Sequence, residues 1–371
     1  MVNPTYVFSW FDLFPYFFLT LLILVLSKFK FRYINNTYCI YFVLLIFACL
    51  RYGIGYDYYN YKKVVLGEMP DFVFDKMEPL AKLFVNVAST IHYQVFFILF
   101  ALVTLYPLYI SVVKKSINPS FSLMLYFLFP IFYLESLSIV RNAAAYSLVL
   151  LAFVFFLEHK RVKYFLLMTL AICLHKSAFV GFLLLPICYF QFGRKVNFVI
   201  YLVSFFLSAW MLFFLTTKVD SLSILKSVSN YALNGAVGAG NTMMIIINLL
   251  GILNFIFWKK LEIVNRDGKL LLNIVNCGVV LWNLFAFEGT LRLRLSSYFL
   301  IFSIILLPNY FYLWGKKYYQ LSRQVVTSFF IILFIASFYI NISNYIKRND
   351  RMSYFPYQTI FYYKDYMNYL Y

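Results

Sequence analysis

The run CIYFVLLIFACL (Cys39–Leu50) is apolar throughout and continues directly into RYGIGYDYYNY (Arg51–Tyr61). The first stretch has the composition of a membrane-spanning helix. The second places an arginine, two glycines, an aspartate and five tyrosines at the end of that helix. A simple connecting loop needs none of this chemistry. The junction therefore indicates a membrane fold with a polar functional surface at its edge.

The composition of the whole chain supports a membrane fold. Its 371 residues are 63% hydrophobic and 12% charged, with a mean hydropathy of +0.79. Soluble domains are about half apolar and a quarter charged. We therefore expect residues 1–371 to form a single integral membrane domain, an all-α polytopic bundle of transmembrane helices. A cleaved signal peptide is not expected, because Asp12 interrupts the first apolar stretch.

Apolar runs of about 15 to 22 residues predict about twelve spans. They are 13–27, 36–51, 95–113, 120–136, 139–157, 163–175, 177–191, 196–217, 242–258, 270–287, 295–314 and 325–343. The five cysteines all lie in apolar runs without the spacing of metal ligands, which indicates core packing. Neither a metal nor a cofactor is expected.

The net charge of +18 is distributed as membrane topology requires, so nucleic acid is not an expected partner. Six short alternate connections hold 17 of the 32 Lys and Arg residues but only 3 of the 14 acidic residues. The positive-inside rule places these connections in the cytoplasm. The loops 51–94 and 218–241 and the tail 344–371 are then on the outer face. Residues 79–92 are expected to form an amphipathic helix in the membrane interface.

Ionisable residues concentrate at the outer ends of the expected helices. Arg141, Arg292 and Arg294 each stand near a helix N-terminus, where the helix dipole already carries positive charge. A bound phosphate-like anion would resolve this conflict. The alternative is pairing with the nearby acids Glu135 and Glu288.

Two further residues are candidates for proton transfer. Asp57 is flanked by Gly53 and Gly55, which allow close backbone approach, and by tyrosines that can stack on sugars. It could accept a proton from a sugar hydroxyl, or it could be a solvated residue within an aromatic belt. His175 is either a catalytic or substrate-contacting residue or a hydrogen-bonded packing residue. The glycine cluster 235–240 lacks the features of a phosphate-binding loop and indicates a flexible outer loop.

Several short motifs, in this order, resemble the EpsG-like branch of the Wzy-type polysaccharide repeat-unit polymerases. They are RYGIGYDYYNY, the pair Glu78-Pro79, SIVRNAAAYSL, LHKSAF, RLRLSSYF and PYQTIFY. In the first motif, Arg51, Gly53, Asp57, Tyr58 and Tyr61 fall on the family signature. One departure is Asn142, where glutamine is expected after the arginine.

The resemblance implies a metal-independent glycosyltransferase with a GT-C-like fold in the bacterial cytoplasmic (inner) membrane. Such an enzyme joins oligosaccharide repeat units linked to undecaprenyl pyrophosphate into O-antigen, capsular polysaccharide or exopolysaccharide. The lipid-linked glycan is both donor and acceptor, and the reaction takes place at the periplasmic face. Membrane lipid, a flippase and a chain-length regulator are the other implied partners.

The expected site combines a base, an anion clamp and an aromatic sugar path. Asp57 or His175 is the base, and the substrate-binding residues are Arg51, Tyr56, Tyr58, Tyr61, Glu135, Arg141, Arg292, Arg294 and Tyr298. Three alternative functions remain open. They are a flippase for lipid-linked oligosaccharides, a membrane O-acyltransferase and an O-antigen ligase.

Overall fold

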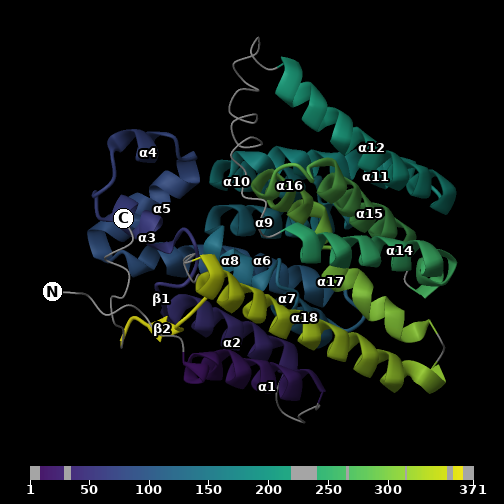
Figure 1. Ribbon diagram of the computed structural model, residues 1–371, viewed down its shortest axis with the longest axis horizontal. Helices are drawn as coiled ribbons and strands as arrows, with labels where there is room; N and C mark the ends of the chain where they lie inside the picture. Colours follow the sequence, from purple (N-terminus) through teal and green to yellow (C-terminus); the bar gives the residue numbers. More distant parts are fainter. Residues whose placement is uncertain are drawn as a thin grey trace. The chain divides into compact units, whose positions relative to one another are not determined.

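The computed structural model describes residues 9–28, 35–218, 240–264, 267–313, 316–348 and 354–361. These residues are almost entirely helical, which confirms the predicted all-α class (Figure 1). They divide into two compact units, of which unit 1 comprises Met1–Lys176 and Arg323–Tyr371 and unit 2 comprises Ser177–Ser322. The expected loop 218–241, the glycine cluster 235–240 and the tail 344–371 lie largely outside the described residues.

Unit 1 carries most of the motif residues. Its elements are η1 (Trp10–Leu13), α1 (Phe14–Lys28), α2 (Asn36–Leu50), β1 (Arg51–Tyr52), α3 (Tyr58–Val65), α4 (Asp71–Asp75), α5 (Pro79–Ile91), α6 (Gln94–Lys115), α7 (Pro119–Leu128), α8 (Tyr133–Ser138), α9 (Val140–Leu157), α10 (Arg161–Leu174), α18 (Tyr319–Arg348, whose first four residues belong to unit 2) and β2 (Gln358–Thr359).

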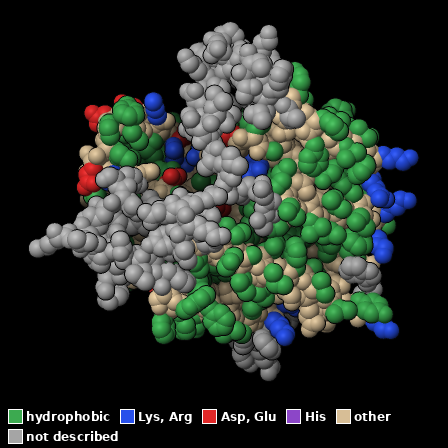
Figure 2. Space-filling model, in the orientation of Figure 1, with side chains coloured by type: hydrophobic (Ala, Val, Ile, Leu, Met, Phe, Trp, Pro, Cys, Tyr) green, Lys and Arg blue, Asp and Glu red, His purple; other side chains and the backbone are tan. Residues whose placement is uncertain are grey.

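The centre of unit 1 is α9, which lies between α6 and α10 (Figure 1). Its Ala143, Ala144 and Ala145 are fully buried, and small side chains let neighbouring helices approach closely. Exposed acidic side chains surround α4 on the face shown in Figure 2, whereas hydrophobic side chains cover the long helices.

Among the described residues, six helical segments are long and apolar enough to cross a membrane, so the chain is a multi-pass membrane protein. They are Trp10–Lys28, Gln94–Lys115, Val140–Leu157, Met243–Val264, Gly289–Tyr312 and Tyr319–Ile340. Each matches an expected span, while the total of twelve stays a prediction. The helix α5 has 13 residues, too short to cross a bilayer of about 30 Å.

The expected span 120–136 is not one continuous helix. The helix α7 ends at Leu128, and Phe129 adopts an extended conformation with φ −82° and ψ 111°. The cause is Pro130, because a proline disfavours helical geometry in the residue before it and cannot donate a backbone hydrogen bond. The chain then turns into the short helix α8, which carries Glu135.

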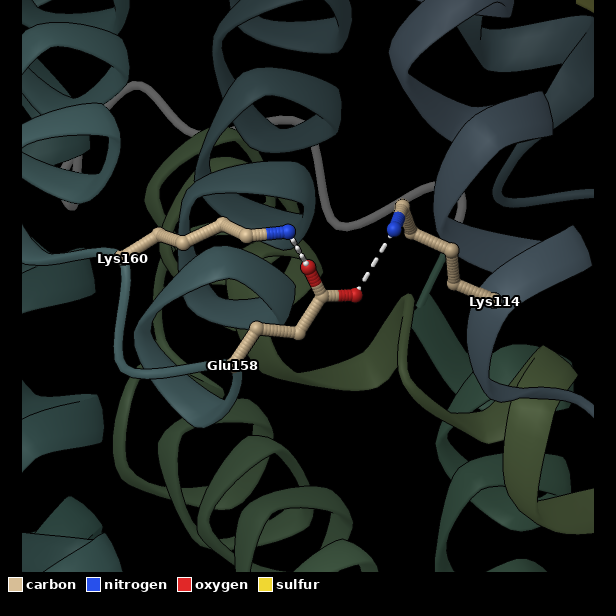
Figure 3. Close-up of polar contacts among 3 residues, drawn as sticks. All are labelled: Lys114, Glu158 and Lys160. Carbon is tan, nitrogen blue, oxygen red and sulfur yellow. Dashed lines mark hydrogen bonds and ion pairs between the residues drawn. The ribbon is translucent and has the colours of Figure 1, made fainter.

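The two ends of α9 carry different polar groups. At its C-terminal end Glu158 lies between two lysines, with its carboxylate oxygens 2.8 Å from Lys114 Nζ and 2.6 Å from Lys160 Nζ (Figure 3). Both lysines belong to short basic connections expected on the cytoplasmic side. At its N-terminal end stands Arg141. With 18 residues, α9 separates these ends by about 27 Å, roughly the thickness of the hydrocarbon core.

A two-stranded antiparallel sheet, which the sequence analysis did not predict, joins the first and last motifs. The strand β1 pairs with β2, with Arg51 opposite Thr359 and Tyr52 opposite Gln358 (Figure 1). The Ile360 amide also donates to the Leu50 carbonyl at 3.0 Å. The C-terminal segment is thereby fixed against the start of RYGIGYDYYNY.

Unit 2 is built around α15. Its elements are η2 (Lys176–Leu183, whose first residue belongs to unit 1), α11 (Leu184–Phe190), α12 (Arg194–Lys218), α14 (Gly240–Val264), α15 (Gly268–Leu284), α16 (Gly289–Leu300), α17 (Ser303–Leu306), η4 (Leu307–Tyr312) and η5 (Lys316–Tyr318).

Interhelical amide pairs hold α15 to its neighbours. They are Asn197 with Asn273, Asn248 with Asn283, and Asn254 with Asn276. Such pairs stabilise helix packing where no water competes for the hydrogen bond.

Candidate functional site

The ion pair between Arg141 and Glu78 is the centre of the candidate site. Arg141 Nη1 donates to Glu78 Oε2 at 2.6 Å, and Arg141 Nε donates to the Tyr61 hydroxyl at 3.0 Å. The guanidinium also lies over the Tyr61 ring, 5.7 Å from its centroid. These residues come from α9, from the residue preceding α5, and from α3.

Glu78 also reaches the histidine motif. The backbone amide of Lys176 donates to Glu78 Oε1 at 3.2 Å. His175 immediately precedes it, ends α10 as its C-cap residue, and is buried. One carboxylate therefore links Arg141 with the segment that carries His175.

The Arg141–Glu78 pair is partly accessible. The Arg141 side chain is 24% exposed and that of Glu78 is 12% exposed. A guanidinium has five N–H donors, and among the described residues Arg141 uses only Nε and Nη1. The Nη2 group is thus available to an additional acceptor, such as a phosphate oxygen.

Two glycines shape the turn that precedes α3. Gly53 and Gly55 have φ of +70° and +107°, a conformation that side chains other than glycine rarely adopt. A Cβ on Gly55 would also lie 2.1 Å from the Leu137 carbonyl oxygen. The loop therefore packs directly on α8, where the Tyr56 amide donates to Ser138 Oγ at 3.2 Å.

The three tyrosines expected along a sugar path occupy different environments. Tyr56 is 48% exposed, and Tyr61 is partly buried beside Arg141. Tyr58 is fully buried, stacked on Phe97 with ring centroids 4.3 Å apart, and its hydroxyl donates to Gln94 at 3.2 Å. Of the three, Tyr56 and Tyr61 are the ones that a ligand could reach in this structure.

Arg51 is buried within unit 1. It is 2% exposed, its guanidinium lies 5.3 Å from the Phe97 ring centroid, and its Nε and Nη2 have no hydrogen-bond partner among the described residues. Arg51 also lines a small cavity of about 10 Å³, together with the polar residues Thr104 and Ser136. That volume is enough for about one water molecule.

Glu135 lies near Asp57 but does not pair with Arg141. Its Oε1 accepts a hydrogen bond from the Tyr354 hydroxyl at 3.1 Å, which ties α8 to the C-terminal segment. Glu135 stands on α8, outside the six candidate spans. The pKa of Glu135 is raised from 4.5 to about 7, mainly because burial removes the carboxyl group from water. The Asp57 carboxylate raises this pKa further, and the hydrogen bond from Tyr354 partly opposes the shift.

Asp57 precedes α3 as its N-cap residue, and its side chain makes no capping hydrogen bond. It is partly buried. The backbone carbonyl of Asp57 accepts from the Tyr61 amide at 3.0 Å, so the two side chains are one helical turn apart. Asp57 thus belongs to the same α3 segment that supports Arg141.

The remaining predicted residues lie in unit 2. Glu288 caps α16 by accepting hydrogen bonds from the amides of Thr290 and Leu291. Arg292 is 7% exposed and stacks over the Trp282 ring at 4.8 Å, and its Nε has no partner among the described residues. Arg294 is partly buried.

Tyr298 is buried as well, with its hydroxyl 2.9 Å from Ser177 Oγ. The part of the chain that the structure describes contains no ion pair between Glu288 and Arg292.

The alternative pairing considered from the sequence is therefore wrong for Arg141, whereas the Glu288 carboxylate acts on Arg292 through its charge without forming an ion pair among the described residues. Glu78, rather than Glu135, neutralises Arg141, and Glu288 serves as a helix cap. Glu78 was missing from the expected site residues, although its position in an acid–proline pair within the ordered motifs was a signal that could have identified it. Unit 1 brings together Tyr61, Glu78, Arg141 and the segment after His175.

A family model described as the EpsG family matches residues 34–359. No curated protein and no solved structure matches the chain. The matched range begins before α2, ends in β2 and includes every residue of the cluster around Arg141. The chain belongs to the EpsG family.

Proposed function

We propose that this protein is a membrane glycosyltransferase that polymerises oligosaccharide repeat units linked to undecaprenyl pyrophosphate. The observation that carries the proposal is the cluster of Tyr61, Glu78, Arg141 and Lys176 in unit 1. These residues come from four separate motifs of the resemblance. Packing them together around one arginine is what a shared anionic substrate would require.

In the proposed reaction, a hydroxyl of the acceptor sugar attacks the anomeric carbon of the donor glycan. A carbon–oxygen bond forms there while the bond to pyrophosphate breaks, and undecaprenyl pyrophosphate leaves with the electron pair. Asp57 or His175 takes the hydroxyl proton. Arg141 stabilises the charge that develops on the leaving group.

The accessible tyrosines give the sugars a surface to contact. Tyr56 is exposed, and Tyr61 lies directly beside the arginine. Aromatic rings of this kind can stack against the apolar faces of sugars. For Arg292 and Arg294 we propose that their guanidinium groups also serve an anion, since the Nε atom of each is buried without a hydrogen-bond partner among the described residues.

The two ends of α9 support a reaction on the outer face of the bacterial cytoplasmic membrane. Lys114 and Lys160 belong to loops that the positive-inside rule assigns to the cytoplasm, and they meet at Glu158. Arg141 is at the opposite end of the same helix. We therefore place its cluster on the periplasmic side, where a flippase would deliver the substrate and a chain-length regulator would act.

The test compares two ion pairs of equal length at the two ends of α9. Arg141→Ala removes the pair with Glu78, and Lys160→Ala removes a pair with Glu158, both 2.6 Å long. Surface glycan from each strain is resolved as a ladder on a gel. We expect Arg141→Ala to leave single repeat units and Lys160→Ala to keep full-length ladders.

Full-length ladders from Arg141→Ala, with the variant present at wild-type level, would overturn the proposed role of Arg141. A deletion strain separates the alternative functions. Repeat units retained on the cytoplasmic leaflet would indicate a flippase, and full-length glycan lacking acetyl groups would indicate an acyltransferase. Polymer that forms but remains on its lipid carrier would indicate a ligase.

A further inference from the structure

Glu78 occupies a position where an acidic side chain would ordinarily serve its own helix. It is the N-cap residue of α5, directly before Pro79, yet its carboxylate makes no capping hydrogen bond. Capping would satisfy free amides in the first turn and favour the helix dipole. The carboxylate instead accepts hydrogen bonds from Arg141 and from the Lys176 amide. Its contacts therefore connect the start of α5 with the first turn of α9 and with the residues that follow α10.

This arrangement changes how Arg141 can bind an anion. The Glu78 carboxylate already uses part of the guanidinium, at 2.6 Å, and cancels its positive charge locally. A phosphate oxygen that approaches Arg141 Nη2 meets a guanidinium already paired with the Glu78 carboxylate. That carboxylate carries the same negative charge as the phosphate. Like charges at such short range oppose one another, so the carboxylate lowers the affinity of the site for the incoming anion.

The pair is nevertheless able to open. Both side chains are partly exposed, so water can solvate the carboxylate when it moves away. The Lys176 amide offers Glu78 Oε1 a second hydrogen bond that does not depend on Arg141. An anion can thus replace Glu78 at Nη1 without leaving the carboxylate unsatisfied.

We propose that Glu78 is an internal competitor for Arg141 that sets the affinity of the site for pyrophosphate groups and promotes release of the pyrophosphate-bearing product. It is a positioning residue, since it acts through Arg141. The identity of the ligand as a lipid-linked pyrophosphate rests on the proposed function. The competition itself rests on the observed pair and holds for any ligand that carries a pyrophosphate group.

Release is the step in which a competitor matters most. Cleavage of the glycan converts a pyrophosphate diester into a monoester, which gains negative charge and binds a guanidinium more tightly. An arginine without a competing carboxylate would hold that product and slow each cycle. Glu78 can return to Nη1 as the product leaves, because its backbone position beside Pro79 is fixed by α5.

The test uses the full-length protein in detergent, with inorganic pyrophosphate as the probe in isothermal titration calorimetry. Glu78→Gln keeps the shape of the side chain and removes its charge. We expect it to bind pyrophosphate on the order of 10-fold more tightly than the wild type, a difference of about 1.4 kcal/mol. Arg141→Gln should lose most of the binding, and the double variant should match Arg141→Gln.

Glu78→Asp provides a second variant, which retains the charge but shortens the side chain. Its affinity for pyrophosphate should lie between those of the wild type and Glu78→Gln. Glu158→Gln, at the other end of α9, is the control and should bind as the wild type does. In a polymerisation assay, Glu78→Gln should lower both KM and kcat, because slower release limits turnover. A merely structural role would not lower KM.

Two different results would each overturn a different claim. If Arg141→Gln weakens binding while Glu78→Gln binds pyrophosphate no more tightly than the wild type, the competitor role is wrong and the anion site stands. If Arg141→Gln binds as the wild type does, the proposed anion site at Arg141 fails, and with it the competition.

Discussion

The Arg141 guanidinium lies 2.6 Å from the Glu78 carboxylate, although the two residues are 63 positions apart in the sequence. This pair fixes the first turn of α9 against the start of α5. Because Glu78 also accepts from the Lys176 amide, the end of α10 is held at the same point. The pair thus determines how three segments of unit 1 converge.

The Tyr61 hydroxyl should contribute to the orientation of Arg141. It accepts from Arg141 Nε at 3.0 Å, so Tyr61→Phe removes the hydrogen bond and keeps the ring. We expect polymerisation to fall about 10- to 100-fold, because a hydrogen bond to a charged group contributes about 1.5–3 kcal/mol. Ladder density and the rate of lipid-linked glycan consumption measure this. Tyr106→Phe, on the exposed surface of α6, should have no effect and serves as the control.

The turn at Gly55 should tolerate no side chain. Gly55→Ala places a Cβ 2.1 Å from the Leu137 carbonyl oxygen in addition to the strain of a positive φ. Gly67→Ala imposes positive φ alone, since nothing lies within 4 Å of its Cβ.

We expect Gly67→Ala to cost about 1–2 kcal/mol and Gly55→Ala substantially more. Thermal unfolding in detergent compares the two. Equal melting temperatures would show that the contact with α8 does not constrain the turn.

The strand pairing at the C-terminal segment should be necessary for activity. Ile360→Pro removes the amide that donates to the Leu50 carbonyl at 3.0 Å. Ile360→Ala keeps that amide and serves as the matched control. We expect the proline variant to lose polymerisation through displacement of β1, which carries Arg51 and Tyr52, and the alanine variant to retain it. Ladders of equal length from both variants would show that β2 is dispensable.

The Glu158 pair should stabilise the protein in a pH-dependent way. Hydrogen bonds from Lys114 and Lys160 lower the pKa of Glu158 from 4.5 to about 2. Between about pH 2 and pH 4.5 the folded state binds fewer protons than the unfolded state. The stabilisation by the Glu158 pairs is therefore full above about pH 4.5 and is lost as the pH falls toward 2.

At neutral pH we expect Glu158→Gln to cost at most about 1 kcal/mol, because these groups are partly exposed. The difference in melting temperature from the wild type should shrink by more than half near pH 3. A difference that stayed constant from neutral pH to pH 3 would contradict the pairing. The variant should retain full activity, since Glu158 is far from Arg141 along α9.

Some elements of the fold were predictable because they depend on local composition. The six candidate spans follow from predominantly apolar stretches, which form helices because backbone groups cannot remain unsatisfied in lipid. The break after Leu128 was also encoded locally, in Pro130, but a count of apolar residues alone does not register it. The partner of Arg141 is not encoded locally, because Glu78 is 63 residues away in the sequence whereas Glu135 is six residues away.

The environment of a side chain was less predictable than the existence of a helix. Tyr56 and Tyr58 stand two positions apart in one motif, yet the first is exposed and the second stacks on Phe97 in the core. Their spacing in the sequence cannot specify this, because it depends on how α6 packs beside the turn. The burial of Arg51 follows from the same packing and from β2.

The amino-acid sequence alone predicts a helical membrane protein, the positions of its polar motifs and the family that it resembles. Those properties follow from hydropathy, charge distribution and short motifs, all of which are local. Two further features appear only in the folded protein: β2 pairs with the start of RYGIGYDYYNY, and Glu78 neutralises Arg141. Both are contacts between distant segments, and such contacts form when buried helix faces pack, a process that no local pattern specifies.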